Sequence, residues 1–229
     1  MNIVHYLVSR GADLNIKTGD GRTPVFVAAQ EGQYAMLKEL AHQGADLNIV
    51  DDSSITPTFM AAQKGNTKMV KCLVSLGADI NLPDAEGTTP LMVASQNRHL
   101  ETVRLMISTG KVDIDAMRRT GETAVFIAAR QGHYDLVQLL GNSGADLDIP
   151  AAEGWTATMV AARNGFFQTV QVLARLGADL NRTRPSGASA VWVAAQNKHY
   201  EVLQILGDCG ADMDILARGV IEGKRSENS

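Results

Sequence analysis

Short apolar stretches recur along the chain and share one arrangement of hydrophobic and polar positions. VFVAAQ at residues 25–30 returns as VFIAAR at 125–130 and as VWVAAQ at 191–196. A hydroxyl residue lies two positions before each stretch, where its oxygen can accept from the free N–H groups of a helix's first turn. The residues predicted to cap helices in this way are Thr23, Thr56, Thr89, Thr123, Thr156 and Ser189. The pattern therefore predicts a short helix after each of them.

A glycine follows most of these helices, and a second apolar pattern begins after it. Gly32, Gly65, Gly132 and Gly165 suit the left-handed conformation that ends a helix. The next segments, such as MLKEL and MVKCLV, have the spacing of an amphipathic helix and end at the tripeptide Gly-Ala-Asp. The stretch DLNIKTGDGR after the tripeptide is rich in Asn, Asp and Gly, which is typical of a tight hairpin. Each unit therefore has the order helix, turn, helix, hairpin.

The unit returns at a nearly constant spacing. Gly-Ala-Asp begins at Gly11, Gly44, Gly77, Gly144, Gly177 and Gly210, with the variant GKVDID at Gly110. The intervals are 33 residues except for one of 34, which reflects an extra residue just after Gly110. A period of this length indicates a solenoid, because a pair of short helices can bury its apolar faces only against neighbouring pairs.

The chain resembles the ankyrin repeat family, whose signature is T-P-L-H-x-A-A, then G-H, then a GADxN ending. RTPVFVAAQEGQYAMLKELAHQGADLN at 22–48 and ITPTFMAAQKGNTKMVKCLVSLGADIN at 55–81 carry the resemblance. It implies an all-α repeat solenoid of helix-turn-helix-hairpin units stacked in a curved array. The predicted ankyrin repeat domain is 1–216, with a half repeat at 1–15 and full repeats at about 16–48, 49–81, 82–115, 116–148, 149–181 and 182–214. We expect residues 217–229 to be a disordered polar tail.

The array begins in the middle of a repeat, since NIVHYLVSRGADLN supplies only a second helix. Terminal repeats of a solenoid need a polar cap. We therefore expect Ile3, Val4 or Leu7 to be partly uncovered. Either the chain is a segment excised from a longer protein, or the array starts incompletely and something else covers this end.

One departure from the family pattern runs through all six full repeats. The position that the family usually fills with His holds Phe26, Phe59, Met92, Phe126, Met159 and Trp192. One interpretation is that these side chains pack under the hairpins and bridge neighbouring repeats. The alternative is an exposed apolar ladder that contacts a partner. Both interpretations leave the fold unchanged.

Composition and charge narrow the class of protein. The 229 residues carry a formal net charge of -4, whereas a nucleic-acid-binding protein needs a basic footprint, so we expect no nucleic-acid partner. The sequence contains no run of about 20 apolar residues, so we expect no insertion into a membrane. Cys72 and Cys209 lie far apart and outside any CxxC pair. We therefore expect reduced thiols in a cytoplasmic protein, with the nucleus as a second possible compartment.

No group of titratable residues predicts catalysis. His99, His133 and His199 occupy equivalent positions in different repeats, so the solenoid keeps them apart. The repeated aspartates are predicted to bond hairpin backbone and not a metal ion; they are Asp13, Asp46, Asp79, Asp146, Asp179 and Asp212. We expect no catalytic residue, no metal and no cofactor, and the protein is not expected to be an enzyme.

The resemblance implies that a partner docks on the concave side, formed by hairpin tips and first helices. Amides end several first helices there: Gln30, Gln63, Gln96 and Gln196. One hairpin tip offers the acidic pair Asp51 and Asp52. The C-terminal half supplies a predicted basic and aromatic patch of Arg118, Arg119, Arg130, Trp155, Arg163 and Arg184. For any of these residues the alternative is solvated surface, and for Trp155 it is packing against the next hairpin.

Trp and Arg are enriched at the hot spots of interfaces, and the patch is basic, so we expect a protein or peptide partner with an acidic segment. The leading hypothesis is a non-catalytic protein–protein interaction scaffold that is monomeric on its own. The alternative is a structural or regulatory segment of a larger protein, which docks or self-assembles through the uncapped N-terminal half repeat.

Overall fold

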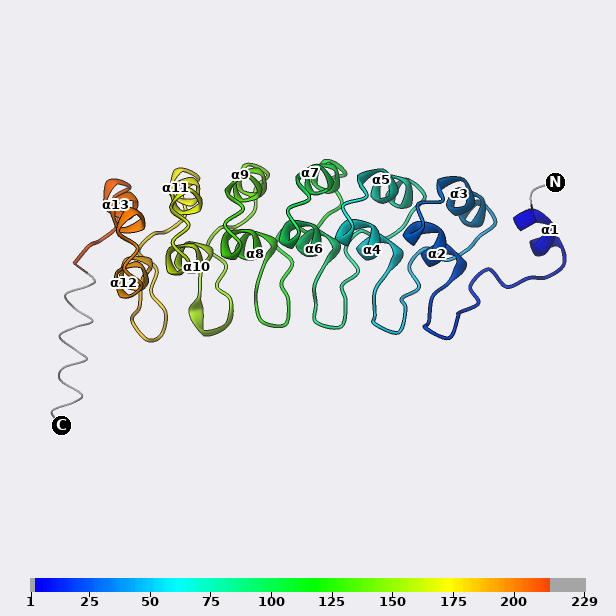
Figure 1. Ribbon diagram of the computed structural model, residues 1–229, viewed down its shortest axis with the longest axis horizontal. Coiled ribbons are helices and arrows are strands. Elements are labelled where there is room, and N and C mark those ends of the chain that lie inside the picture. Colours follow the sequence, from blue (N-terminus) through cyan, green and yellow to red (C-terminus); the bar gives the residue numbers. More distant parts are fainter. Residues whose placement is uncertain (1–2, 215–229) are drawn as a thin grey trace, which may run out of the picture. The chain divides into compact units, whose positions relative to one another are not determined.

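The computed structural model describes residues 3–214, within which two kinds of helix alternate (Figure 1). The first helices of the full repeats are α2 (Pro24–Gln30), α4 (Pro57–Gln63), α6 (Pro90–Gln96), α8 (Ala124–Arg130), α10 (Ala157–Arg163) and α12 (Ala190–Gln196). The second helices are α1 (Ile3–Ser9), α3 (Tyr34–His42), α5 (Thr67–Ser75), α7 (Leu100–Ser108), α9 (Tyr134–Asn142), α11 (Phe167–Arg175) and α13 (Tyr200–Asp208). A short 3-10 turn, η1 (Ala152–Gly154), lies in one loop. The tail predicted at 217–229 lies outside the described residues.

The predicted caps are confirmed in all six full repeats. In each repeat the Thr or Ser hydroxyl oxygen accepts from the backbone N–H three residues later. The distance is 3.2 Å from the Phe26 nitrogen to Thr23 and 3.1 Å from the Phe59 nitrogen to Thr56. Each first helix has seven residues and is too short to persist alone in water, so its cap helps to define where it begins.

The predicted left-handed glycines are also confirmed. Gly32, Gly65, Gly132 and Gly165 have φ angles of 70°, 66°, 74° and 75°. Arg98 and Lys198 occupy the same position in the other two full repeats, with φ angles of 56° and 60°. The left-handed conformation costs a residue with a side chain about 1–2 kcal/mol, so the repeat geometry holds these two residues against their own preference.

The repeated aspartates bond the turn backbone, as predicted. Asp46 accepts from the N–H of Asn48 at 2.8 Å, and the other five repeated aspartates make the equivalent bond. The Asn two positions later then reaches the next repeat: Asn48 Oδ1 accepts from the N–H of Asp79 at 2.9 Å. One motif therefore both closes a turn and pins it to its neighbour.

The predicted hairpins are tight turns with little strand structure. The N–H of Asp51 donates to the carbonyl of Ile55 at 3.0 Å and closes one turn, and corresponding bonds close four other turns. Within residues 3–214, β-type pairing is limited to an isolated antiparallel bridge between Thr183 and Ser189. Side chains at the turns, rather than sheet edges, therefore form the surface that the loops present.

The chain divides into two compact units, Met1–Arg118 and a second that begins at Arg119. In the N-terminal unit α2, α4 and α6 pack in one row, and α3, α5 and α7 pack in another. In the C-terminal unit α8, α10 and α12 form the first row, and α9, α11 and α13 the second. Matching segments of the two units are numbered 100 apart, as VFVAAQ at 25–30 and VFIAAR at 125–130 illustrate. Each unit is thus a version of the same three-repeat block.

The apolar stripe belongs mainly to the core, so the packing interpretation is confirmed for five of its positions. The five buried side chains are Phe26, Phe59, Met92, Phe126 and Met159. Trp192 is half-buried, in the last full repeat of the described chain. The alanines that end the first helices, such as Ala61 and Ala62, are buried beside the stripe and allow neighbouring first helices to approach closely.

Candidate partner-binding surface

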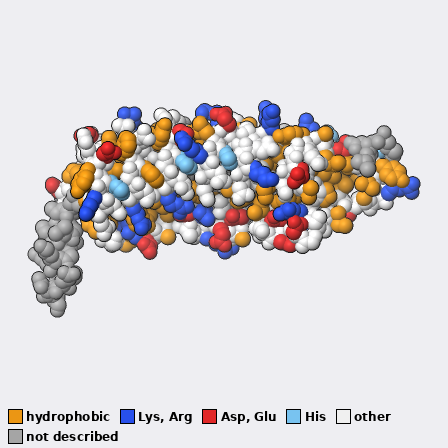
Figure 2. Space-filling model, viewed as in Figure 1, with side chains coloured by type: hydrophobic (Ala, Val, Ile, Leu, Met, Phe, Trp, Pro, Cys, Tyr) orange, Lys and Arg blue, Asp and Glu red, His pale blue; other side chains and the backbone are white. Residues whose placement is uncertain are grey.

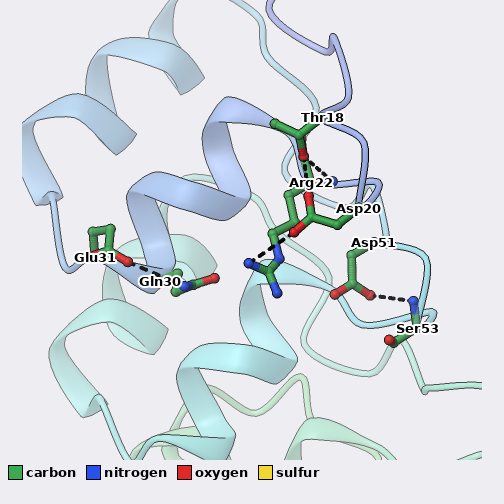
Figure 3. A network of polar contacts seen from close by, with 7 residues as sticks. All are labelled: Thr18, Asp20, Arg22, Gln30, Glu31, Asp51 and Ser53. Atoms are coloured by element: carbon green, nitrogen blue, oxygen red, sulfur yellow. Dashed lines mark hydrogen bonds and ion pairs between the residues drawn. The ribbon is translucent and has the colours of Figure 1, made fainter.

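The turns and the ends of the first helices form one face of each unit. Within each unit in Figure 1, the first helices lie beneath the second helices, and the turns project below. Side chains of both charges gather along the edge over the turns (Figure 2). Of the predicted amides, Gln63, Gln96 and Gln196 are exposed and Gln30 is half-buried. Gln30 Nε2 donates to Glu31 at 3.3 Å, so part of its hydrogen-bonding capacity is used locally (Figure 3).

Asp51 is not part of the accessible surface. Its side chain is buried, and its Oδ1 accepts from the N–H of Ser53 at 2.9 Å and of Ile55 at 3.0 Å (Figure 3). The carboxylate is therefore used to close its own turn, and we leave it out of the proposed surface. Its neighbour Asp52 is exposed at the tip of the turn.

Trp155 lies beside two arginines in the C-terminal unit. The guanidinium carbon of Arg184 is 4.2 Å from the centroid of the indole, and that of Arg163 is 5.2 Å from it. Both distances are in the range of cation–π contacts. Trp155 is half-buried and Arg163 is exposed. We call Trp155, Arg163 and Arg184 the Trp155 cluster.

Among the described residues, Arg184 of the Trp155 cluster is held by an ion pair, whereas Arg163 is not. Arg184 pairs with the Glu153 carboxylate and also donates to the Glu153 carbonyl at 3.1 Å. The guanidinium of Arg163 makes no ion pair within the described chain. Since Arg184 comes from the turn that follows the turn of Trp155, the packing alternative for Trp155 holds in part: the next turn covers it but leaves it half-exposed.

The other predicted arginines of the C-terminal unit, Arg119 and Arg130, are not among the cations over the Trp155 ring. Arg130 pairs with Glu122 and lies 6.0 Å from the Phe126 ring centroid. Arg119 is exposed, at the start of the C-terminal unit. Arg118 is half-buried and belongs to the N-terminal unit. Within the C-terminal unit, Arg163 and Arg184 therefore lie by Trp155, whereas Arg130 pairs with Glu122.

Sequence reasoning missed the carboxylates that fix these arginines. Glu153 and Glu122 each precede a first helix by a few residues, and neither belongs to a repeated motif. A signal for Glu153 was present: it lies 31 residues before Arg184, the separation at which the Asn–Asp bonds link successive turns. No comparable spacing indicates the pair of Glu122 with Arg130, which lie within one repeat.

A second candidate surface is an apolar groove in the N-terminal unit, with a volume of about 640 Å³. It lies where α1 meets the first full repeat, and Leu7, Val27 and Met36 are among its lining residues. Leu7 is 47 % exposed and Val27 is 39 % exposed, whereas Val4 is buried. The expectation that Ile3, Val4 or Leu7 is partly uncovered is therefore confirmed through Leu7. Figure 2 shows hydrophobic side chains gathered at this end of the unit.

A charged turn borders this N-terminal groove. Arg22 and Thr18 line the groove, and Arg22 pairs with Asp20 at 3.2 Å (Figure 3). A hydrogen bond from the Thr18 hydroxyl, with a smaller contribution from Arg22, holds the pKa of Asp20 below its ordinary value. The turn therefore keeps a negative and a positive charge at the rim of an apolar hollow.

Among the described residues we find neither a candidate metal site nor a candidate membrane-spanning helix. No group of three or more His, Cys, Asp or Glu in this part of the chain is arranged to hold a metal ion. None of the described helices has the length and hydropathy to cross a membrane.

Stacked helix pairs joined by projecting turns define the class of helical repeat solenoids. The model for ankyrin repeats, in three copies, matches residues 1–84, 58–151 and 143–217. The chain therefore belongs to the ankyrin repeat family, as the sequence predicted. Repeats of this family are generally modules of protein–protein interaction.

Among solved structures the fold is similar to the ankyrin repeat domain of Bcl-3, described as a unique member of the IkappaB protein family. The two are 28% identical with a TM-score of 0.80, and the match covers 85% of this chain and 89% of the other. The comparison with curated proteins gave no match.

Proposed function

We propose that this protein is a non-catalytic scaffold that binds a partner protein through its first helices and turns, with the Trp155 cluster as the centre of the contact. The observation that carries the proposal is the half-exposed indole beside two guanidinium groups, one of which has no carboxylate partner in the described chain. Trp and Arg contribute most of the binding energy at many interfaces.

The free charge of Arg163 favours an acidic segment in the partner. Arg184 is already held by Glu153, so ordering its side chain adds little cost when a partner binds. Arg163 offers planar donors beside an aromatic surface, which suits a carboxylate flanked by apolar atoms. The exposed amides Gln63, Gln96 and Gln196 can donate and accept, and with Asp52 they add polar contacts on the same face of each unit.

Capture of the partner tests this proposal. The parent chain, an Arg163→Glu/Trp155→Ala variant and an Arg175→Glu control are each used as bait in native cell extract, after their melting curves are matched. Arg175 is an exposed arginine, the last residue of α11, and the cations over the Trp155 ring are Arg163 and Arg184. We expect the parent and the control to capture the same protein, and the double variant to lose it. Equal capture by all three baits would place recognition elsewhere.

Arg163 is a better choice for this test than Arg130. Replacing Arg130 would break an ion pair of the Glu122 carboxylate, whose side chain is only 12% exposed. A loss of binding would then be mixed with a loss of stability.

We place the protein in the cytoplasm or nucleus, and its two unpaired cysteines, buried Cys72 and exposed Cys209, support this assignment.

A second candidate function is docking or self-assembly through the N-terminal groove, and the exposure of Leu7 and Val27 favours it. Light scattering over a range of protein concentrations separates the two functions. The scaffold proposal predicts a monomer at every concentration. Self-assembly predicts a mass that rises with concentration and falls back in a Val27→Asp variant, but not in a Met117→Asp control, whose exposed Met117 lies outside the groove.

A further inference from the structure

Four cations lie on the second-helix face of the N-terminal unit. Lys38 is on α3, Lys68 and Lys71 are on α5, and Arg104 is on α7, and all four are exposed. The helices α3 and α5 contact each other, as do α5 and α7, so the cations follow three neighbouring helices. We call these four residues the basic stripe. In Figure 1 they belong to the upper row of helices, away from the turns.

The basic stripe crosses a hollow of about 310 Å³ between α3 and α5. Tyr34, Lys38, Lys68, Lys71, Cys72 and Ser75 line the hollow, and no carboxylate is among them. The Tyr34 hydroxyl donates to Asn66 at 3.0 Å, which fixes the ring at the edge. In residues 3–214 the three lysines form no ion pair. Arg104 pairs with Glu101 at 3.6 Å, but both side chains are more than half exposed, so that pair contributes little.

The positions of these charges oppose the stability of α5. Lys68 is the second residue of α5, where the helix dipole favours a negative charge. Lys68 and Lys71 are three residues apart on one face and repel each other. No contact within the described unit offsets these unfavourable terms, so the fold itself does not account for the cluster.

The C-terminal unit shows what the fold requires at the same positions. The residues numbered 100 higher are Gln138, Gln168, Gln171 and Gln204, all neutral amides. Gln138, Gln168 and Gln171 line a corresponding hollow of about 240 Å³ between α9 and α11, with Tyr134 in the place of Tyr34 and Arg175 in the place of Ser75. The same helix pair therefore forms with glutamine at each of these positions, and the positive charge is not a packing requirement.

We propose that the basic stripe is a docking surface for an acidic polypeptide segment. Its charges are spread over three successive helices, which suits a chain with several carboxylates better than a single small anion. Cys72 and Tyr34 give the hollow an apolar part that the non-polar atoms of a peptide can cover. The net charge of -4 for the whole chain disfavours a nucleic acid as the occupant. This surface is independent of the Trp155 cluster, so either proposal can fail without the other.

Fluorescence anisotropy with a labelled oligoglutamate peptide tests the basic stripe, with an oligoglutamine peptide of equal length as the neutral probe. All proteins carry Trp155→Ala and Arg163→Gln, which removes the other candidate site for an acidic segment. In that background the stripe variant is Lys38→Gln/Lys68→Gln/Lys71→Gln/Arg104→Gln. The reciprocal variant places Lys, Lys, Lys and Arg at Gln138, Gln168, Gln171 and Gln204.

We expect the stripe variant to bind oligoglutamate at least about tenfold more weakly at low ionic strength, and the reciprocal variant to bind it more tightly than the background protein. Oligoglutamine should bind none of them. The stripe variant should melt at the same temperature as its background or higher, because the C-terminal unit folds with these glutamines. Equal binding of oligoglutamate by the stripe variant and its background would overturn the proposal. Binding of phosphatidylserine vesicles without binding of oligoglutamate would also overturn it.

Discussion

At the scale of single residues, two buried threonines stabilise the fold less than the apolar residues at the same position in the other full repeats. Thr58 and Thr158 are 0% and 1% exposed, and the hydroxyl of each has no hydrogen-bond partner within the described chain. The same position in the other full repeats holds Val25, Leu91, Val125 and Val191. A buried hydroxyl without a partner costs free energy that an apolar side chain of equal shape does not.

We therefore predict that Thr58→Val raises the free energy of unfolding by about 1 kcal/mol. The matched control is Thr56→Val, two positions earlier, where the hydroxyl caps α4 through the Phe59 N–H. That change should lower the free energy of unfolding by about 1 kcal/mol. Urea denaturation of both variants measures the two effects. A shift in the same direction for both would contradict the roles assigned to these hydroxyls.

At the scale of elements, the Asn–Asp bonds between turns hold successive repeats in register. Asn48→Ala removes the acceptor of the Asp79 N–H and should lower the free energy of unfolding by about 0.5–1.5 kcal/mol. Asn48→Asp should be close to neutral, because Asp148 makes the equivalent contact to the Asp179 N–H at 3.1 Å. Thermal melting distinguishes them. Equal losses of stability in the two variants would show that the amide, and not an acceptor oxygen, is what the site needs.

The helices were predictable because local chemistry determines them. A capping hydroxyl such as Thr123 and a left-handed glycine such as Gly132 act within a few residues of themselves, so one copy of the motif is enough to place a helix end. The partners of the arginines were not predictable in this way. Arg130 and Arg184 are each bound by a glutamate that belongs to no repeated motif. The separation of 31 residues between Glu153 and Arg184 matches that of the bonds between turns, whereas nothing comparable indicates the pair of Glu122 with Arg130.

At the scale of the whole molecule, two three-repeat blocks share one set of packing rules and differ in the surfaces that they present. The N-terminal unit carries the basic stripe and the N-terminal groove, and the C-terminal unit carries the Trp155 cluster. The buried alanines and the asparagine or aspartate bonds recur in both units. The two blocks therefore share their packing residues and differ in the surfaces that we propose for partner binding.

The most direct test of the central claim is the affinity of the captured partner for three forms of the full chain, measured by isothermal titration calorimetry. The forms are the parent, Arg163→Glu and Arg175→Glu, which change the same charge on exposed arginines of neighbouring helices in the C-terminal unit. We predict a dissociation constant at least about tenfold weaker for Arg163→Glu and unchanged for Arg175→Glu. Equal affinities for all three forms would contradict the assignment of the Trp155 cluster as the binding site.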